Sequence, residues 1–413
     1  MSTQSESPDE YTQRAGNLLA NNYGPAPLTF TGADGAFLVT ATGDRYLDFG
    51  SGISVTSFGQ GHEKVRAAIL RQMDGVWHTS NLFYTRPSLD LAAKLIEDSF
   101  AERVFFANSG AEANEAAIKL VRKAASATRP PEQRTILTFQ GGFHGRTLAT
   151  VTATAQPKYH QGFEPLPGGF KYCEFNNVDA LRAAVNETVC AIMFEPVQGE
   201  GGVNVAQPEF VAEVRRLADH FGAYVIVDEV QSGIARTGKL WAHEWYALVP
   251  DVMTSAKALG GGLPIGAVLI GETLADVFKP GSHGSTFGGN PLCCAAANAV
   301  MELASSPSVQ AQVLERGEQL EHGLAQINDR HSVFSQIRGR GLMLGAQLRE
   351  PFRDHIAALV AACRDEGLLV LQAGHGVLRL LPPLTVTAGD VTLMLHKLER
   401  ALESGWADKK EHT

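Results

Sequence analysis

The chain has 413 residues, of which 44% are hydrophobic and 19% are charged, and its formal net charge is −9. This length allows two or three domains with substantial cores, and the acidic balance excludes the basic surface that nucleic-acid binding requires. No apolar run approaches the roughly 18 residues that cross a bilayer. The five cysteines include no CxxC pair and the first residues are polar and acidic, which predicts reduced thiols in a soluble cytoplasmic protein.

The first 75 residues predict short elements around glycine-rich turns. Residues 1–22 are expected to begin irregularly and to continue as a short helix, and two short strands, Thr29–Phe30 and Ala36–Thr40, flank a turn. Residues 50–62 contain four glycines, which predicts a loop that either approaches a ligand closely or is simply exposed. Glu63–Gly75 has apolar residues at spacings of four and is predicted to be an amphipathic helix.

A candidate anion site follows the next predicted strand, Val104–Ala107. The helix that comes after it, Ala113–Ala124, repeats its apolar residues with helical spacing, and a Ser-Gly-Ala turn beginning at Ser109 joins the two elements. Free backbone N–H groups, a hydroxyl and the positive end of a helix dipole together favour a phosphate. Ser109 could equally serve only as the cap of the helix.

Two further strands are followed by polar residues. Arg134–Phe139 leads into a loop in which Phe143 could stack on a planar ring and Arg146 could hold a carboxylate in a bidentate fork, although both could also be ordinary loop residues. The central strand Val189–Phe194 leads into a glycine-rich loop with two acids, Glu195 and Glu200. These acids lack neighbouring histidines or cysteines, so the sequence predicts a polar site and no metal centre.

The segment 223–262 contains the most informative pair of residues. The apolar run Tyr224–Val227 ends abruptly at Asp228, which is typical of a strand buried on both faces of a parallel sheet, with an acid at the edge where ligands bind. Lys257 lies among small and apolar residues before three glycines, and burial would make its amine a nucleophile. Pyridoxal phosphate requires such a lysine and an acid beside its ring nitrogen. Alone, Asp228 could also be a capping acid or a metal or nucleotide ligand.

The remaining elements indicate a second, smaller α+β unit. After the strand Ile265–Ile270 comes a turn in which Ser285 and Thr286 offer hydroxyls to a phosphate and Asn290 caps a helix. From Leu303 the pattern changes to a smaller α+β unit in which Arg379 lies in the last predicted strand. Its predicted elements are a helix at Val309–Ile327, strands at Met343–Leu348, Leu368–Gln372 and Val377–Leu380, and a final helix at Asp390–Glu403.

Seven ordered motifs, namely NSGAEANEA, GGFHGRTL, FEPVQGEGG, VDEVQSG, SAKALGGG, STFGGNPL and LRLLPPL, resemble those of the class III pyridoxal-phosphate-dependent aminotransferases over roughly residues 23–400. The pattern is most similar to the acetylornithine aminotransferase group, and also similar to the ornithine and 4-aminobutyrate aminotransferases. The resemblance implies an α/β protein of PLP-dependent transferase fold type I. Its large domain, 61–304, would hold a mostly parallel seven-stranded sheet between helices, and the segments 1–60 and 305–413 would form the small domain.

The resemblance also implies the cofactor-binding residues. Lys257 would bind pyridoxal 5′-phosphate covalently and then shuttle a proton, while Asp228 would pair with the ring nitrogen. The remaining cofactor contacts would be Gln231 at the ring hydroxyl, Phe143 and Val230 on the two ring faces, and Ser109, Gly110 and Ala111 at the phosphate. Thr286 would reach the phosphate from the neighbouring subunit, which implies a homodimer with two shared active sites.

The expected substrates follow from the same resemblance. Arg146 would hold the distal carboxylate, and Arg379 would be masked by Glu200 for an ω-amino donor and freed for glutamate, since an unpaired buried arginine beside a methylene is unfavourable. Glu195 and Ser285 complete the expected substrate contacts. Ile53 stands where ornithine aminotransferases carry a tyrosine, which favours a donor with an acylated α-amine.

The expected reaction is transfer of the δ-amino group of N2-acetyl-L-ornithine to 2-oxoglutarate, which gives N-acetylglutamate 5-semialdehyde and glutamate for arginine biosynthesis. Alternative donors are succinylornithine, an N-acyl-lysine, a diaminopimelate derivative, 4-aminobutyrate or ornithine, and an aminomutase on the same fold is a further alternative. A nucleotide-binding oxidoreductase is excluded because no GxGxxG follows the first strand of a βαβ unit.

Overall fold

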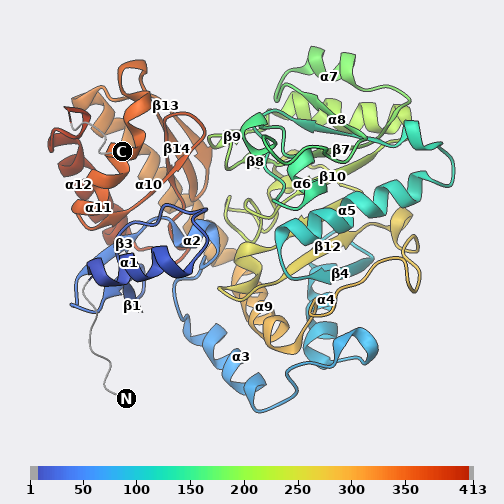
Figure 1. Ribbon diagram of the computed structural model, residues 1–413, viewed down its shortest axis with the longest axis horizontal. Helices are drawn as coiled ribbons and strands as arrows, with labels where there is room; N and C mark the ends of the chain where they lie inside the picture. Colours follow the sequence, from blue (N-terminus) through green and yellow to red (C-terminus); the bar gives the residue numbers. More distant parts are fainter. Residues whose placement is uncertain (1–7, 409–413) are drawn as a thin grey trace.

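The structure is a computed structural model that describes residues 8–408. A seven-stranded sheet with helices on both faces forms the larger part, and elements from the two ends of the chain lie beside it (Figure 1). The chain begins with the helix α1 (Pro8–Leu18), and the predicted irregular start, residues 1–7, lies outside the described residues. None of the helices within 8–408 is both long and apolar enough to cross a membrane.

The large sheet confirms the predicted fold class. Its strands, in spatial order, are β4 (Arg103–Ala107), β12 (Gly266–Ile270), β11 (Val252–Ser255), β10 (Tyr224–Asp228), β7 (Val189–Phe194), β5 (Thr135–Phe139) and β6 (Phe170–Cys173). Strand β12 is antiparallel to both of its neighbours, and all other neighbouring pairs are parallel. The carboxyl ends of the six codirectional strands therefore lie along one edge of the sheet.

Alternation along the central strands explains why helices cover both faces. On β10, Val225 and Val227 pack in a cluster with residues of α8 (Pro208–Phe221), whereas Ile226 packs with α5 (Gly110–Ala125) on the other face. Successive side chains of a strand point to opposite faces, so an uninterrupted apolar run requires cover on both. The other helices of the larger part are α3 (Glu63–Met73), α4 (Arg86–Glu97), α6 (Leu148–Ala153), α7 (Val178–Ala184) and α9 (Pro291–Ala304).

Both ends of the chain contribute to the second part. One four-stranded sheet has the order β1 (Phe30–Asp34), β2 (Phe37–Thr40), β3 (Arg45–Asp48), β15 (Leu368–Leu369), and the other has the order β13 (Phe334–Arg340), β14 (Met343–Leu348), β17 (Val377–Leu380), β16 (Leu371–Ala373). The helices α10 (Pro307–His331), α11 (Ile356–Asp365) and α12 (Ala388–Glu403) belong to this part, and a short β8 (Val197–Gln198) pairs with β9 (Asn204–Val205) beside it.

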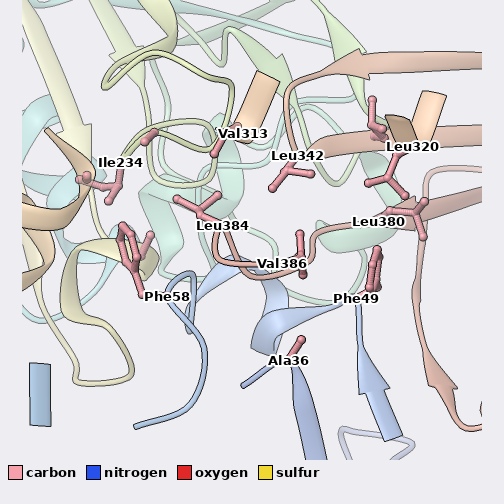
Figure 2. Close-up of a cluster of buried hydrophobic side chains, with 14 of the residues drawn as sticks. Ala36, Phe49, Phe58, Ile234, Val313, Leu320, Leu342, Leu380, Leu384 and Val386 are labelled. Carbon is pink, nitrogen blue, oxygen red and sulfur yellow. The ribbon is translucent and has the colours of Figure 1, made fainter. Parts of the chain in front are cut away.

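One apolar cluster joins the N-terminal and C-terminal segments. Figure 2 shows Ala36, from the turn between β1 and β2, and Phe49, which follows β3, in one cluster with Leu320, Leu380 and other side chains of the C-terminal segment. A shared core of this kind explains why the two ends of the chain form one unit. The domain boundaries themselves, 1–60, 61–304 and 305–413, remain a prediction.

Two local features differ from the sequence-based expectation. The strand predicted at Leu368–Gln372 is divided, because β15 pairs with β3 in one sheet and β16 pairs with β17 in the other. The expected irregular loop at 50–62 begins with a tight turn, α2 (Ser51–Ser54), in which all four residues have positive φ. Ile53 is one of them, with φ of 61°, and a β-branched residue in this region carries backbone strain.

Candidate active site

The carboxyl ends of the parallel strands surround a cavity of about 230 Å³. Strand β10 ends at Asp228, β7 is followed by Glu195, and β11 is followed at two residues' distance by Lys257. Most of the site residues expected from the sequence line this cavity, namely Gly110, Ala111, Phe143, Arg146, Glu195, Glu200, Asp228, Val230, Gln231 and Lys257. Parallel α/β sheets bind ligands at this edge.

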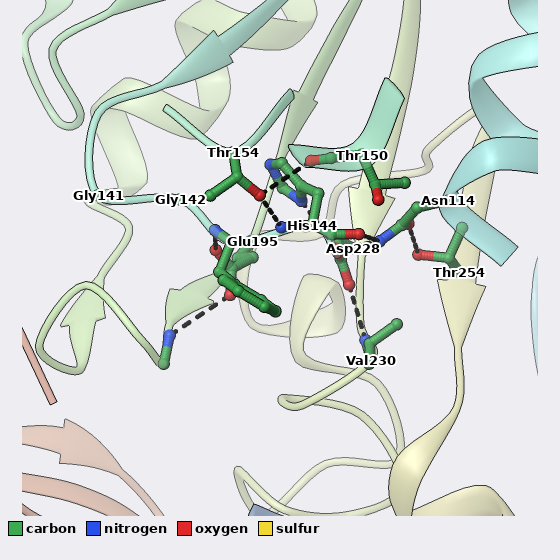
Figure 3. A network of polar contacts seen from close by, with 12 residues as sticks. Asn114, Gly141, Gly142, His144, Thr150, Thr154, Glu195, Asp228, Val230 and Thr254 are labelled. Carbon is green, nitrogen blue, oxygen red and sulfur yellow. Dashed lines mark hydrogen bonds and ion pairs between the residues drawn. The ribbon is translucent and has the colours of Figure 1, made fainter. Parts of the chain in front are cut away.

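Asp228 is buried and accepts hydrogen bonds on both oxygens. Its Oδ1 accepts from the backbone N–H of Val230 at 3.0 Å, and its Oδ2 accepts from Asn114 Nδ2 at 2.7 Å and lies 2.8 Å from His144 Nδ1. Figure 3 shows the carboxylate between His144 and Asn114. Burial alone would lower the pKa of His144, but the hydrogen bond to Asp228 and the negative charges of Asp228 and Glu195 raise it above the usual value.

Glu195 is a second buried acid in the same cavity. Its Oε2 accepts from the backbone N–H of Phe143 at 2.9 Å, and its Oε1 accepts a longer bond of 3.4 Å from the N–H of Gly199. Burial raises the pKa of Glu195 to about 8, and the charge of Asp228 adds to this effect against the opposing influence of His144. The raised pKa favours the protonated form of Glu195.

Lys257 begins the short helix η5 (Lys257–Gly260) with a φ of 43°, a backbone conformation that is strained for a non-glycine residue. Its amine makes no hydrogen bond or ion pair within the described range, 8–408. Burial lowers the pKa of this amine, and Arg379 lowers it further against the opposing charges of Glu200, Asp228 and Glu195. A low pKa increases the fraction of neutral, nucleophilic amine.

An ion pair between Glu200 and Arg379 forms one side of the site. Glu200 Oε1 lies 2.6 Å from Arg379 Nη1, and Gln231 bridges the pair, because its Nε2 donates to Glu200 Oε1 at 3.3 Å and its Oε1 accepts from Arg379 Nη1 at 3.3 Å. The Arg379 side chain, on β17, is 2% exposed, and its Nε has no partner among residues 8–408. Burial alone would raise the pKa of Glu200, but Arg379 and Lys257 hold it below the usual value.

Arg146 and Phe143 come from the loop after β5 and lie at the cavity wall. Arg146 is exposed, and its guanidinium stacks over the ring of Tyr159 at 4.1 Å and over that of Phe143 at 5.5 Å. Arg146 has no acidic partner among the residues that the structure describes. An arginine held by aromatic rings with its donors free is suited to bind a carboxylate.

The N-terminus of α5 opens onto the cavity at Gly110 and Ala111. Ser109 caps this helix by accepting a hydrogen bond from the N–H of Glu112 at 3.1 Å, as one of the two sequence-based interpretations expected. A Cβ at Gly110 would lie 2.7 Å from Val230 Cγ1, so a glycine is required where the helix meets this side chain. The unpaired N–H groups at the start of α5 make an anion site.

Five predicted residues are not among those that line this cavity. Two of them adjoin it, since Ser109 caps α5 and Arg379 contacts the lining residues Glu200 and Gln231, and the other three are Ser285, Thr286 and Ile53. Ser285 and Thr286 line a neighbouring pocket of about 350 Å³, where Ser285 Oγ accepts from Asn108 Nδ2 at 3.1 Å, and Ile53 lies in the strained turn and is 44% exposed. The sequence analysis missed Asn114 and His144, which line the main cavity. Signals for both existed, because Asn114 is the polar residue in an alanine-rich helix face and His144 follows Phe143 directly.

The match to the family model named Aminotransferase class-III covers residues 18–402. This chain belongs to the class III aminotransferase family. It is 48% identical to an acetylornithine aminotransferase of Xanthomonas campestris, over 92% of this chain and 94% of that protein, and 45% identical to a succinylornithine transaminase of Yersinia enterocolitica, over 93% and 94%. The crystal structure of N-acetylornithine aminotransferase from Stenotrophomonas maltophilia has a TM-score of 0.85 and 40% identity, and the match covers 96% of this chain and 100% of that chain.

The chain is thus a PLP-dependent aminotransferase, and the cavity fits pyridoxal phosphate. Burial prepares an unpaired amine on Lys257, Asp228 presents a carboxylate, and the α5 N-terminus offers N–H groups to a phosphate. Gly110 keeps open the space beside Val230 that a Cβ would fill. A lysine, an acid, apolar contacts and an anion site are the groups that this cofactor requires.

Proposed function

We propose that this aminotransferase moves the δ-amino group of N2-acetyl-L-ornithine to 2-oxoglutarate, which yields N-acetylglutamate 5-semialdehyde and glutamate. The observation that carries the proposal is the ion pair between the buried Arg379 and the partly buried Glu200, in a site where Arg146 has no acidic partner among the described residues. An enzyme that uses both an ω-amino donor and an α-oxo acid needs one site that binds a carboxylate of both substrates. It also needs a second carboxylate site that is available for the α-oxo acid and covered when the ω-amino donor is bound. The curated relatives named as acetylornithine aminotransferases, at 44–48% identity, support the choice of donor.

Each residue has a proposed role in this reaction. Bound pyridoxal phosphate withdraws the electrons released when the reacting carbon loses its proton. Lys257 binds the cofactor and moves that proton, and Asp228 keeps a proton on the ring nitrogen. Cofactor contacts are completed by Gln231 at the ring hydroxyl, Phe143 and Val230 on the ring faces, and Ser109, Gly110, Ala111 and the partner subunit's Thr286 at the phosphate.

The substrate residues divide the two half-reactions between them. Arg146 holds the distal carboxylate of both substrates. Glu200 covers Arg379 while the carbon bearing the δ-amine is present, and it releases Arg379 when glutamate or 2-oxoglutarate brings an α-carboxylate. Glu195, Ser285 and Ile53 complete the proposed substrate contacts, and Ile53 offers an apolar surface to the acylated end of the donor.

We also propose a cytoplasmic homodimer with shared active sites. Exposed large apolar side chains concentrate in one segment, which includes Trp77, Leu82, Phe83 and Tyr84, at 56%, 80%, 71% and 92% exposure. This segment adjoins the pocket that contains Thr286, because Asn81 Nδ2 donates to Ser285 O at 2.9 Å. Apolar patches of this kind mark interaction surfaces, and a second copy covering the patch would bring Thr286 close to the partner's site.

The half-reaction tests the function directly. The visible absorption of the cofactor-loaded enzyme is recorded before and after addition of N-acetylornithine without oxo acid, with Lys257→Gln as the control. In the wild type, we expect N-acetylornithine to abolish the visible absorption band of the lysine-bound cofactor and 2-oxoglutarate to restore it. A band that resists N-acetylornithine but responds to N-succinylornithine would transfer the assignment to the donor named in the Yersinia relatives. If none of the ω-amino donors changes this visible absorption band, the proposal is refuted.

A further inference from the structure

A network of buried polar side chains contacts the Asp228 carboxylate, and two of its members, Asn114 and His144, also line the cavity. Thr254 on β11 donates its hydroxyl to Asn114 Oδ1 at 2.7 Å, and Asn114 Nδ2 donates to Asp228 Oδ2 and to the backbone carbonyl of His144 at 2.8 Å. The Nδ1 of His144 contacts Asp228 Oδ2, and the backbone N–H of His144 donates to Thr154 Oγ1 at 2.8 Å (Figure 3). Asp228 is the one member of this hydrogen-bonded network to which the sequence analysis gave a role.

The geometry fixes the orientation of each member. The Asn114 carbonyl oxygen accepts from Thr254, so its NH₂ group faces Asp228 and His144 and donates to both. All three contacts on the Asp228 carboxylate are then donors, because the N–H of Val230 takes the other oxygen. Hydrogen bonds to a carboxylate favour its charged form. Every member is nearly inaccessible, with exposures of 4% or less, so water does not replace a lost donor.

The charges around His144 favour its cationic form. The groups that face it are Asp228 at the end of β10 and Glu195 after β7, both acids. Imidazolium can donate from Nδ1 without exchanging tautomers. A proton on Nδ1 of His144 is donated to the carboxylate that the cofactor nitrogen would use, across 2.8 Å.

We infer that His144 is a positioning residue for the aminotransferase reaction, which holds the Asp228 side chain aimed into the cavity, and that Asn114, itself oriented by Thr254, is a second positioning residue for Asp228. The inference rests on the proposed role of Asp228. Without the cation and one donor, the carboxylate would rotate and would compete with the ring nitrogen for a proton. His144 and Asn114 act through Asp228, to which both are hydrogen-bonded.

The test compares His144→Gln with His243→Gln in the cofactor-loaded enzyme. His243 is a matched control, because it is buried, its Nδ1 lies 2.8 Å from the carbonyl of Leu248, and it lies outside the cavity. The readouts are the midpoint of the pH titration of the visible absorption band, kcat and KM for the donor, and the thermal unfolding of the cofactor-free protein. The titration uses no substrate, so a wrong donor assignment would leave it interpretable.

For His144→Gln we expect kcat to fall about 10- to 100-fold with a small change in KM, because misplacement of a reacting group by about 1 Å costs this much. The midpoint should move to higher pH by about one unit, since loss of a nearby positive charge makes protonation easier. His243→Gln should lower stability and leave the midpoint in place. An unchanged midpoint in His144→Gln, or an equal shift in both variants, would overturn the inference.

Thr254→Val provides a second variant that keeps the histidine and is nearly isosteric. It removes only the hydroxyl that orients Asn114. If His144→Gln does not fold or does not bind the cofactor, Thr254→Val decides the question. A shift of its midpoint in the same direction, smaller than about one unit, is the expected result, and a midpoint equal to that of the wild type would overturn the inference.

Discussion

Replacement of Glu200 by alanine is expected to move the donor preference from N-acetylornithine toward glutamate. In the structure, Glu200 Oε1 lies 2.6 Å from Arg379 Nη1, and the arginine side chain is 2% exposed. Glutamate can use Arg379 only after this ion pair opens, whereas an ω-amino donor leaves the pair closed. In Glu200→Ala, glutamate can bind Arg379 without first breaking an ion pair. When N-acetylornithine reacts, by contrast, the buried guanidinium of Arg379 has lost its acidic partner.

The magnitude follows from the burial of the pair. Removal of one partner of a fully buried ion pair costs about 3–5 kcal/mol. The Glu200 side chain is 23% exposed, and Gln231 still contacts Arg379 through its amide oxygen. We therefore expect Glu200→Ala to change the difference in activation free energy between the two donors by about 2 kcal/mol. This free energy corresponds to about a 30-fold rise in the ratio of kcat/KM for glutamate to kcat/KM for N-acetylornithine.

The assay measures kcat/KM for both donors by the half-reaction with the wild type, Glu200→Ala and Glu200→Gln. The glutamine variant keeps the volume and a hydrogen bond but removes the charge, so its ratio should fall between the other two. Arg379→Met should abolish the use of glutamate while N-acetylornithine still reacts. A ratio in Glu200→Ala within about threefold of the wild type, equivalent to less than about 0.7 kcal/mol, would refute the masking role.

Two further predictions concern pH and assembly. Because the pKa of Glu195 is raised to about 8, the folded state keeps a proton that the unfolded state releases, and this group makes stability fall as pH rises from about 4.5 to 8. Between pH 6 and 8, the free energy of unfolding of Glu195→Gln should therefore fall by about 2 kcal/mol less than that of the wild type. Urea unfolding of the cofactor-free proteins measures this difference, and parallel pH profiles of the two proteins would contradict the prediction. Tyr84→Arg should give monomers in sedimentation velocity and weaker cofactor binding, whereas the exposed Val249→Arg should not; a dimeric Tyr84→Arg would place the interface elsewhere.

The sequence predicted those site residues whose signal is local. Asp228 ends one apolar strand and Glu195 follows another, and both strands were recognisable because runs buried on both faces contain no polar interruption. Lys257 was recognised from the small and apolar residues around it and the three glycines that follow. The Ser-Gly-Ala turn before α5 was recognisable for a similar reason, since a strand, a capping hydroxyl and a helix follow one another within a few residues.

The features that the sequence did not predict depend on distant partners. The pairing of Asn114 with Asp228 spans 114 residues, so the position of Asn114 in an alanine-rich helix face indicated a buried amide but could not identify its partner. The division of Leu368–Gln372 between two sheets also depends on distant strands, β3 and β17. Ile53 adopts positive φ although its side chain disfavours it, so tertiary packing determines the backbone there against the local preference.

The two buried acids of the cavity show why the surroundings, and not the residue type, determine the chemistry. Asp228 ends one central strand and Glu195 follows another, yet Asp228 is hydrogen-bonded to two side chains, Asn114 and His144, while the donors to Glu195 are backbone N–H groups. Burial raises the pKa of Glu195 to about 8, whereas the hydrogen bonds to both oxygens of Asp228 fix the orientation of its side chain. The elements that create the difference are α5, β11 and the loop after β5, so a substitution at Thr254 can change the chemistry of a cavity that it does not line.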